Sequence, residues 1–330
     1  MKILRILLII IVLASLIAYV RATDMQQVMD SMHRIGYRFL VLLLVTFVSA
    51  MLATIGWKYC FGMAGNALSL RDLFFIRLVG ETVGIVNPAS ALGGDAVKAI
   101  LMRDRPVPQK TVLASLLISR VVMTITQVSL FLVALIVLYF KNDLAMRWPT
   151  TPLAIVFAIL CSVPAIYFLM RRSWFRDMLR PTPFGAGLAR RTAKMRQKIG
   201  EVRLEITSFY RNHKRDLLLS ALFFALHWIS GALEFYFILM FLGVKATVVQ
   251  ALLVDMGVIF FKSAGAFIPG QIGVEEYGNK VMLAAIGAAG TEIWVTASIL
   301  RRTRQLFWIV AGLVTYVMMY RNWDFRFRKS

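Results

Sequence analysis

Acidic side chains are scarce in this chain of 330 residues, which carries 38 lysines and arginines but only 17 aspartates and glutamates. Cysteine is rarer still: Cys60 and Cys161 both lie in or beside apolar segments, so a disulfide framework is not expected. The chain lacks GxSxG, HExxH and Walker sequences, and also the Cys/His spacings that hold metals. We therefore expect no enzyme activity from a known catalytic motif, no cofactor and no metal site.

Apolar residues are abundant instead. They make up 59% of the chain and give it a mean hydropathy of +0.71. Soluble domains are about half apolar, so the excess is expected to face lipid. Each long run approaches the roughly 20 residues that a membrane span requires. No clean cleavage site follows the first run, which we interpret as an uncleaved helix. The predicted full spans are 3–20, 39–57, 112–140, 153–170, 217–242 and 292–320.

The basic residues lie mostly between these runs. Segment 171–215 alone has 13 basic and 3 acidic residues, which predicts a cytoplasmic loop. Both chain termini then fall on the cytoplasmic side of the membrane. Nucleic-acid binding is not expected, because the basic residues are not interleaved with aromatics on a soluble module. Within the loop, residues 190–210 have an apolar face. They form either an amphipathic helix on the headgroups or a helix packed on the bundle.

Two further apolar segments, 73–102 and 248–290, are broken by proline, glycine and charge. The first break reads GETVGIVNPASALGGDAVKA and the second reads FKSAGAFIPGQIGVEEYGNK. Pro269 follows Pro88 by 181 positions, and the same offset aligns Asp95 with Glu276. Proline and glycine interrupt helices, so each segment is predicted to be a re-entrant hairpin. The predicted turn residues are Pro88, Gly93, Gly94, Pro269, Gly270 and Gly273.

The offset extends beyond the breaks. It places 39–57 on 220–238 and 112–140 on 293–321, so each repeat reads span, hairpin, span. With segment 171–215 inside, the two repeats begin on opposite sides of the membrane, which predicts an inverted repeat. The alternative is a chance alignment of common membrane residues. The predicted fold is thus all-α, with six full spans and two re-entrant helical hairpins. It is a single polytopic domain, 1–330, with repeats at about 36–140 and 217–321.

Charged residues inside the apolar segments are the candidate site, because charge at membrane depth needs a partner. Asp95 has a second interpretation as a helix cap. Glu81 falls opposite Lys262 in the repeat, which suggests an ion pair. Arginines within spans bind carboxylates or phosphates. The candidate substrate-binding residues are Glu81, Asn87, Gly93, Gly94, Asp95, Lys98, Arg120, Lys262, Gly273, Glu275, Glu276, Arg301 and Arg302.

His227 and Glu234 lie seven residues apart in the span 217–242, on one helical face. Such a pair is either a proton relay or a packed polar pair.

The motifs PASALGGDAVKAILM and FIPGQIGVEEYG resemble those of the lysylphosphatidylglycerol synthase transmembrane-region family, also called flippase-like. LRRTRQLFWIVAGL resembles its hopanoid-biosynthesis-associated branch. Asn87 and Ser119 depart from the acids expected in many relatives. The resemblance implies an inner-membrane protein of eight segments that moves or handles lipids or lipid-linked glycans. The aminoacyl transferase domain of some members is missing, so synthase activity is not carried over.

These patterns together predict a lipid translocase that receives an anionic headgroup between the hairpins. The expected partners are anionic phospholipids, polyprenyl-phosphate-linked glycans or hopanoid-type lipids, with a soluble pathway enzyme as a further candidate at the basic loop. Two alternatives stay open: an intramembrane enzyme that alters a lipid carrier, and a non-catalytic partner protein in an envelope-lipid pathway.

Overall fold

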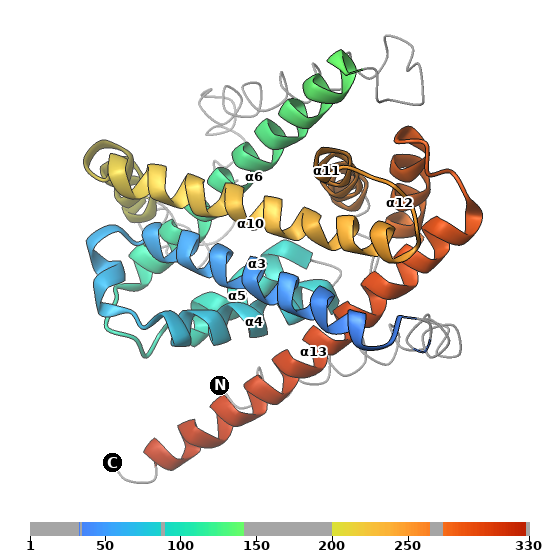
Figure 1. The fold of residues 1–330 in the computed structure, drawn as a ribbon. Helices are drawn as coiled ribbons and strands as arrows, with labels where there is room; N and C mark the ends of the chain where they lie inside the picture. The colour runs from blue at the N-terminus through green and yellow to red at the C-terminus, as the bar shows by residue number, and fades with distance from the viewer. Residues whose placement is uncertain (1–32, 34, 87–89, 142–199, 265–272, 328–330) are drawn as a thin grey trace, which may run out of the picture.

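The computed structural model describes residues 33, 35–86, 90–141, 200–264 and 273–327, and all regular structure within these ranges is helical (Figure 1). Several predicted features lie outside them. These are the spans 3–20 and 153–170, most of the basic loop 171–215, and the break residues Asn87, Pro88, Pro269 and Gly270.

The described residues of the first half form four α-helices and two short 3₁₀ turns. In chain order they are η1 (Gly36–Arg38), α3 (Phe39–Tyr59), η2 (Gly62–Ala67), α4 (Leu70–Val86), α5 (Ser90–Leu101) and α6 (Gln109–Phe140). Proline has a fixed φ and no N–H group, so Pro108 suits the cap position before α6.

The second half repeats this order of helix lengths. After a helix over 200–212 come α10 (Lys214–Phe241), α11 (Val248–Ala264), α12 (Val274–Ala285) and α13 (Thr291–Phe327). In both halves a helix of 17 residues and one of 12 stand between two long helices. At 1.5 Å per residue the shorter helices measure about 26 and 18 Å, less than the roughly 30 Å hydrocarbon core.

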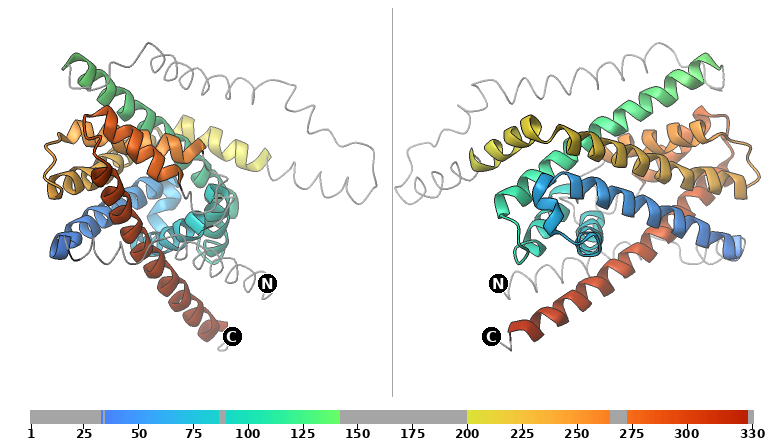
Figure 2. Two further views of the ribbon diagram at one scale, coloured as in Figure 1. Left: turned by 90° about the vertical axis from the view of Figure 1, so that its right-hand side faces the viewer. Right: turned by 60° about the vertical axis from the view of Figure 1, so that its left-hand side comes forward.

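Three helical segments of the described chain are long and apolar enough to cross a membrane: Gly36–Tyr59, Gln109–Phe140 and Lys214–Phe241. They coincide with the predicted spans 39–57, 112–140 and 217–242. The predicted span 292–320 falls within α13, which is 37 residues long and continues past the rest of the described bundle (Figure 2). The all-helical membrane character is thereby confirmed, whereas the count of six spans and the two re-entrant hairpins stay predictions.

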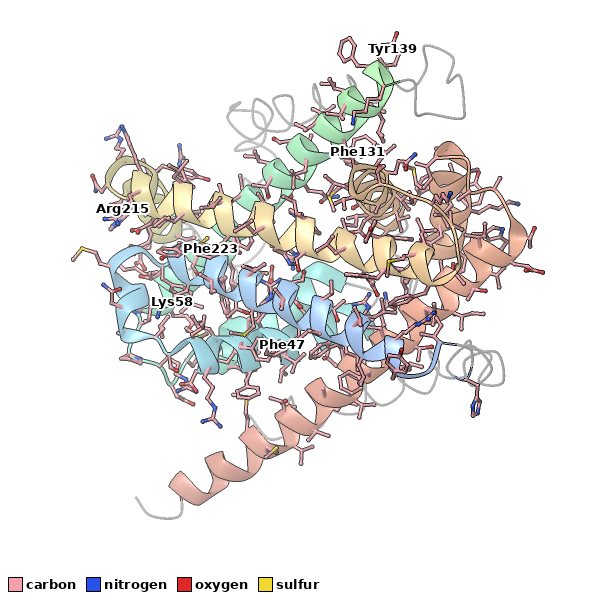
Figure 3. The ribbon with its side chains drawn as sticks, viewed as in Figure 1. Phe47, Lys58, Phe131, Tyr139, Arg215 and Phe223 are labelled. Atoms are coloured by element: carbon pink, nitrogen blue, oxygen red, sulfur yellow. The ribbon has the colours of Figure 1, made fainter. Side chains whose placement is uncertain are left out.

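Helices α3 and α10 lie side by side and run in opposite directions (Figures 1 and 3). Ser49 contacts His227, and Cys60, at the end of α3, contacts Ser220 near the start of α10. A Cβ atom on Gly56 would lie 3.0 Å from the ring of Phe224, so glycine allows the two helices to approach closely.

The two halves also exchange contacts. Helix α4 of the first half packs against α13, and α11 of the second half packs against α6. Phe131 on α6 meets Phe260 on α11 with ring centroids 5.0 Å apart. At the contact between α4 and α13, Gly312 of α13 lies directly against Thr82 of α4. Each half therefore completes the packing of the other.

The helix over 200–212 packs on the bundle. Phe209 is 6% exposed and joins the apolar core of the first half. Thr111, near the start of α6, donates a 2.8 Å hydrogen bond to Glu205. For the described part of segment 190–210, the structure favours the helix packed on the bundle over the helix lying on headgroups.

Candidate functional site

The first candidate site is built on the contact between α4 and α5, where two glycines meet. A Cβ atom on Gly94 would lie 2.5 Å from the carbonyl oxygen of Gly80, so the backbones touch there. The prediction that Gly93 and Gly94 form the turn was wrong. Both lie inside α5, and Gly94 serves close helix packing, which favours small residues in membranes.

Asp95 lies in the second turn of α5 and is the centre of this site. Its capping interpretation was wrong, because α5 begins at Ser90 and the Asp95 carboxylate faces α6 instead. Arg120 of α6 donates two hydrogen bonds to it, Nε–Oδ2 at 2.8 Å and Nη2–Oδ1 at 3.1 Å. Lys98 contacts the same carboxylate, Nζ–Oδ1 at 3.3 Å. Two cations thus share one carboxylate.

The two cations differ in exposure. The Lys98 side chain is 10% exposed, and its ammonium lies 5.9 Å from the centre of the Trp57 ring. The Arg120 side chain is 45% exposed and lies on the same face of α6 as exposed Leu117 and Val121. The pair of Asp95 and Arg120 is therefore reachable from the outer, apolar surface of α6.

Glu81 has a partner that the sequence analysis overlooked. Arg77, one helical turn earlier in α4, contacts it with Nε–Oε1 at 2.6 Å. The Arg77 side chain is 8% exposed. The available signal was the spacing of four residues between opposite charges on one predicted helix. The proposed pair of Glu81 with Lys262 stays a prediction.

The second candidate site, in α12 and α13, has an equivalent pair. Glu276 forms an ion pair with Arg302 of α13, as Asp95 does with Arg120 of α6. Glu276 also accepts a 2.7 Å hydrogen bond from the backbone N–H of Gly273, the residue that caps α12. Gly273 has a φ of +81°, a conformation that suits glycine, which agrees with its predicted place in the turn.

Arg301, the neighbour of Arg302, is buried among carboxylates. It lies 2.9 Å from Asp255 of α11 and 3.1 Å from Glu275 of α12. Glu275 also contacts Lys262 at 2.9 Å and accepts a hydrogen bond from Gln305. Asp255 was missed by the sequence analysis, although it is the one charged residue between Val248 and Phe261.

Glu234 belongs to the same buried network. Arg304 contacts it at 2.5 Å, and Arg301 lies 4.0 Å away. His227, by contrast, faces α3, where its Nδ1 lies 2.7 Å from the Ser49 hydroxyl. Seven helical residues span about 10.5 Å, too far for direct proton transfer between them. A relay through both residues stays a prediction.

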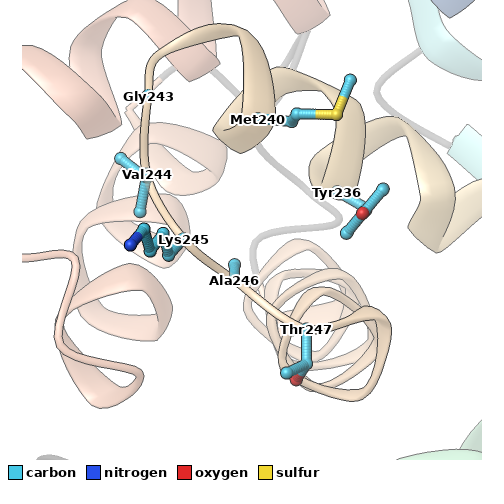
Figure 4. Close-up of a pocket in the computed structure, with 7 residues that line it drawn as sticks. All are labelled: Tyr236, Met240, Gly243, Val244, Lys245, Ala246 and Thr247. Carbon is cyan, nitrogen blue, oxygen red and sulfur yellow. The ribbon is translucent and has the colours of Figure 1, made fainter.

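A pocket lies elsewhere, at the connection between α10 and α11 (Figure 4). It has a volume of about 440 Å³. Its lining consists of Tyr236, Met240, Gly243, Val244, Lys245, Ala246 and Thr247, and none of these was a predicted site residue. With a single charged side chain, it offers little to a charged headgroup.

Comparisons with known proteins match most of the chain. The family profile described as "Lysylphosphatidylglycerol synthase TM region" matches residues 2–312. The chain is also similar to the UPF0104 membrane protein PH1989 of Pyrococcus horikoshii. The two are 24% identical over 294 residues, which cover 85% of this chain and 87% of that protein. No solved structure matches.

Proposed function

This chain belongs to the lysylphosphatidylglycerol synthase transmembrane-region family, and on that premise we propose that it is a lipid translocase. Its cargo is a lipid or lipid-linked glycan with an anionic headgroup. The pair formed by Asp95 and Arg120, with Lys98 behind it, receives that headgroup. The family name supports a role connected with lipids, and the remaining steps rest on the geometry of the site.

The proposal rests on one observation: Arg120 and Lys98 both contact the carboxylate of Asp95. Two cations therefore lie around one carboxylate, and this local concentration of positive charge would attract an anionic phosphate. The planar guanidinium of Arg120 suits bidentate contact with phosphate oxygens, while Lys98 supplies a second donor.

Exposure of the site supports entry from the bilayer. Arg120 is 45% exposed among apolar side chains that face outward from α6. A lipid could therefore place its phosphate on Arg120 while its tails stay beside Leu117, Val121 and Ile125. The candidate cargo lipids are anionic phospholipids, polyprenyl-phosphate-linked glycans and hopanoid-type lipids.

The packing of the halves supports an inverted repeat, the arrangement typical of alternating-access transporters. Helices α3 and α10 occupy equivalent places in the two repeats and run antiparallel. A two-fold axis in the membrane plane produces this relation, whereas a tandem repeat would leave equivalent helices parallel. The exchanged contacts of α4 with α13 and of α11 with α6 obey the same symmetry.

The charge distribution along the sequence supports an orientation with both termini and the basic loop 171–215 in the cytoplasm. The proposed location, a bacterial inner membrane, rests on the resemblance to the family. In that orientation the first hairpin, which carries Asp95, enters from the cytoplasmic side. The second, which carries Glu276, enters from the opposite side.

Transbilayer movement of fluorescent phosphatidylglycerol in proteoliposomes tests the proposal. The wild-type protein should accelerate movement over protein-free vesicles. Loss of Arg120 removes charge-assisted hydrogen bonds of about 1.5–3 kcal/mol each, so Arg120→Ala should slow movement by about tenfold or more. Arg103→Ala, which removes an exposed charge beyond α5, is the matched control. Equal rates in wild-type, Arg120→Ala and empty vesicles would contradict the proposal. A covalently altered lipid, detected by mass spectrometry, would favour the enzyme alternative.

A further inference from the structure

The two pairs of arginine and carboxylate occupy equivalent places in the two halves. Asp95 and Glu276 are 181 positions apart, and Arg120 and Arg302 are 182 positions apart. Arg120 follows the first residue of α6 by 11 positions, and Arg302 follows the first residue of α13 by 11 positions. In both halves the pair joins the 12-residue helix to the long helix that comes after it.

The pairs differ in their access to the surroundings. The Arg120 side chain is 45% exposed, whereas the Arg302 side chain is 13% exposed. The neighbours of Arg120 on α6 include exposed Leu117, Val121 and Ile125. On α13, residues 293–306 are all buried or half-buried. Arg120 is therefore open to the outer surface of the bundle, while its counterpart Arg302 is covered; the two carboxylates, at 19% and 22%, are about equally exposed.

From this asymmetry we propose that Arg302 and Glu276 form a second headgroup-binding station, which is closed in the present conformation. This inference rests on the proposed translocase function. The lipid phosphate binds first at Arg120, on the side from which the first hairpin enters. When each half adopts the conformation that the other has now, Arg302 becomes exposed and Arg120 becomes covered. Arg302 then presents the same phosphate to the opposite leaflet.

Arg301 is excluded from this role, although it adjoins Arg302. It is 6% exposed and has contacts with Asp255, Glu275 and Glu234, so its charge is already matched by carboxylates. A phosphate there would have to displace buried anions. Arg302, which forms an ion pair with Glu276, reproduces the pairing of Arg120 with Asp95.

The test separates a binding station from a structural ion pair. In the double variant Arg302→Met with Glu276→Gln, the glutamine can still accept the Gly273 hydrogen bond, so α12 keeps its cap. Replacing a buried ion pair by uncharged residues of similar size is often neutral for stability. A merely structural pair would therefore leave translocation intact in this variant.

The measurements are binding and transbilayer movement of fluorescent phosphatidylglycerol, for the wild type, the double variant and Arg120→Ala. The double variant should bind within about twofold of the wild type through the open station, but move lipid about tenfold or more slowly. Arg120→Ala should lose both properties. Wild-type movement in the folded double variant would overturn the second station alone. Binding loss in the double variant equal to that in Arg120→Ala would also overturn it. If the wild-type protein moves no lipid, both the proposed translocase function and the second station are overturned.

Discussion

Arg301 of α13 donates a 2.9 Å hydrogen bond to Asp255 of α11, and both side chains are 6% exposed. This pair holds together two helices that are far apart in sequence. It explains why an arginine can lie deep within an otherwise apolar bundle. It also assigns Arg301 to the scaffold, which distinguishes it from Arg120 and Arg302, the arginines proposed to bind lipid.

Asp255→Asn should therefore be strongly destabilising. Glu275 and Glu234 also contact Lys262 and Arg304, so removing the Asp255 charge leaves the buried network with one unmatched positive charge, at a cost of about 3–5 kcal/mol. Denaturant unfolding in mild detergent measures the change. Asp72→Asn is the matched control, because Asp72 and its partner Arg105 are 39% and 31% exposed and such pairs contribute about 1 kcal/mol or less. Equal losses in the two variants would argue against a scaffold role for Asp255.

Gly94→Ala should separate α4 from α5. The added Cβ would lie 2.5 Å from the Gly80 carbonyl oxygen, so the two backbones would have to move apart. Overpacking of this kind costs about 1–3 kcal/mol. Gly200→Ala is the control, because nothing lies within 4 Å of its added Cβ and alanine favours helix there. Thermal unfolding of the purified variants compares them, and a Gly94→Ala protein as stable as the control would refute the close contact.

The sequence predicted α3, α6 and α10 to within a few residues, because their apolar runs are long. It also indicated Asp95, Arg120 and Arg302 as candidate site residues, because an isolated charge in an apolar segment is costly unless it has a partner or a function. It could not predict which charges pair, because pairing depends on how helices pack. Gly93 and Gly94 were misplaced for a related reason: glycine serves both tight turns and close helix contacts, and only the fold distinguishes them.

Ser220→Cys should form a disulfide bond with Cys60. The Cys60 sulfur lies 3.1 Å from the Ser220 hydroxyl oxygen, across the antiparallel contact of α3 and α10. With Cys161→Ser in the background, mild oxidation should give a linked peptide that mass spectrometry identifies. Ala221→Cys, turned about 100° around the same helix, should link poorly. Equal linking of both cysteines, or of neither, would contradict this packing.

Lys98→Met should weaken the preference for anionic lipids. It removes one of the two cations that share Asp95 and leaves the pair with Arg120 in place. The loss of one charge-assisted contact corresponds to about tenfold or more in affinity. The ratio of the affinities for fluorescent phosphatidylglycerol and fluorescent phosphatidylethanolamine measures this preference. Lys280→Met, which removes an exposed lysine of α12, is the control. An unchanged ratio would exclude Lys98 from the headgroup site.

The central claim is that a lipid phosphate binds where Arg120 meets Asp95 and Lys98. An experimental structure of the protein in a bilayer that contains anionic lipid tests it most directly. Headgroup density should lie within hydrogen-bond distance of the Arg120 guanidinium, with tails along the exposed face of α6. Ordered lipid elsewhere on the protein, with Asp95 and Arg120 still paired and no headgroup beside them, would contradict it.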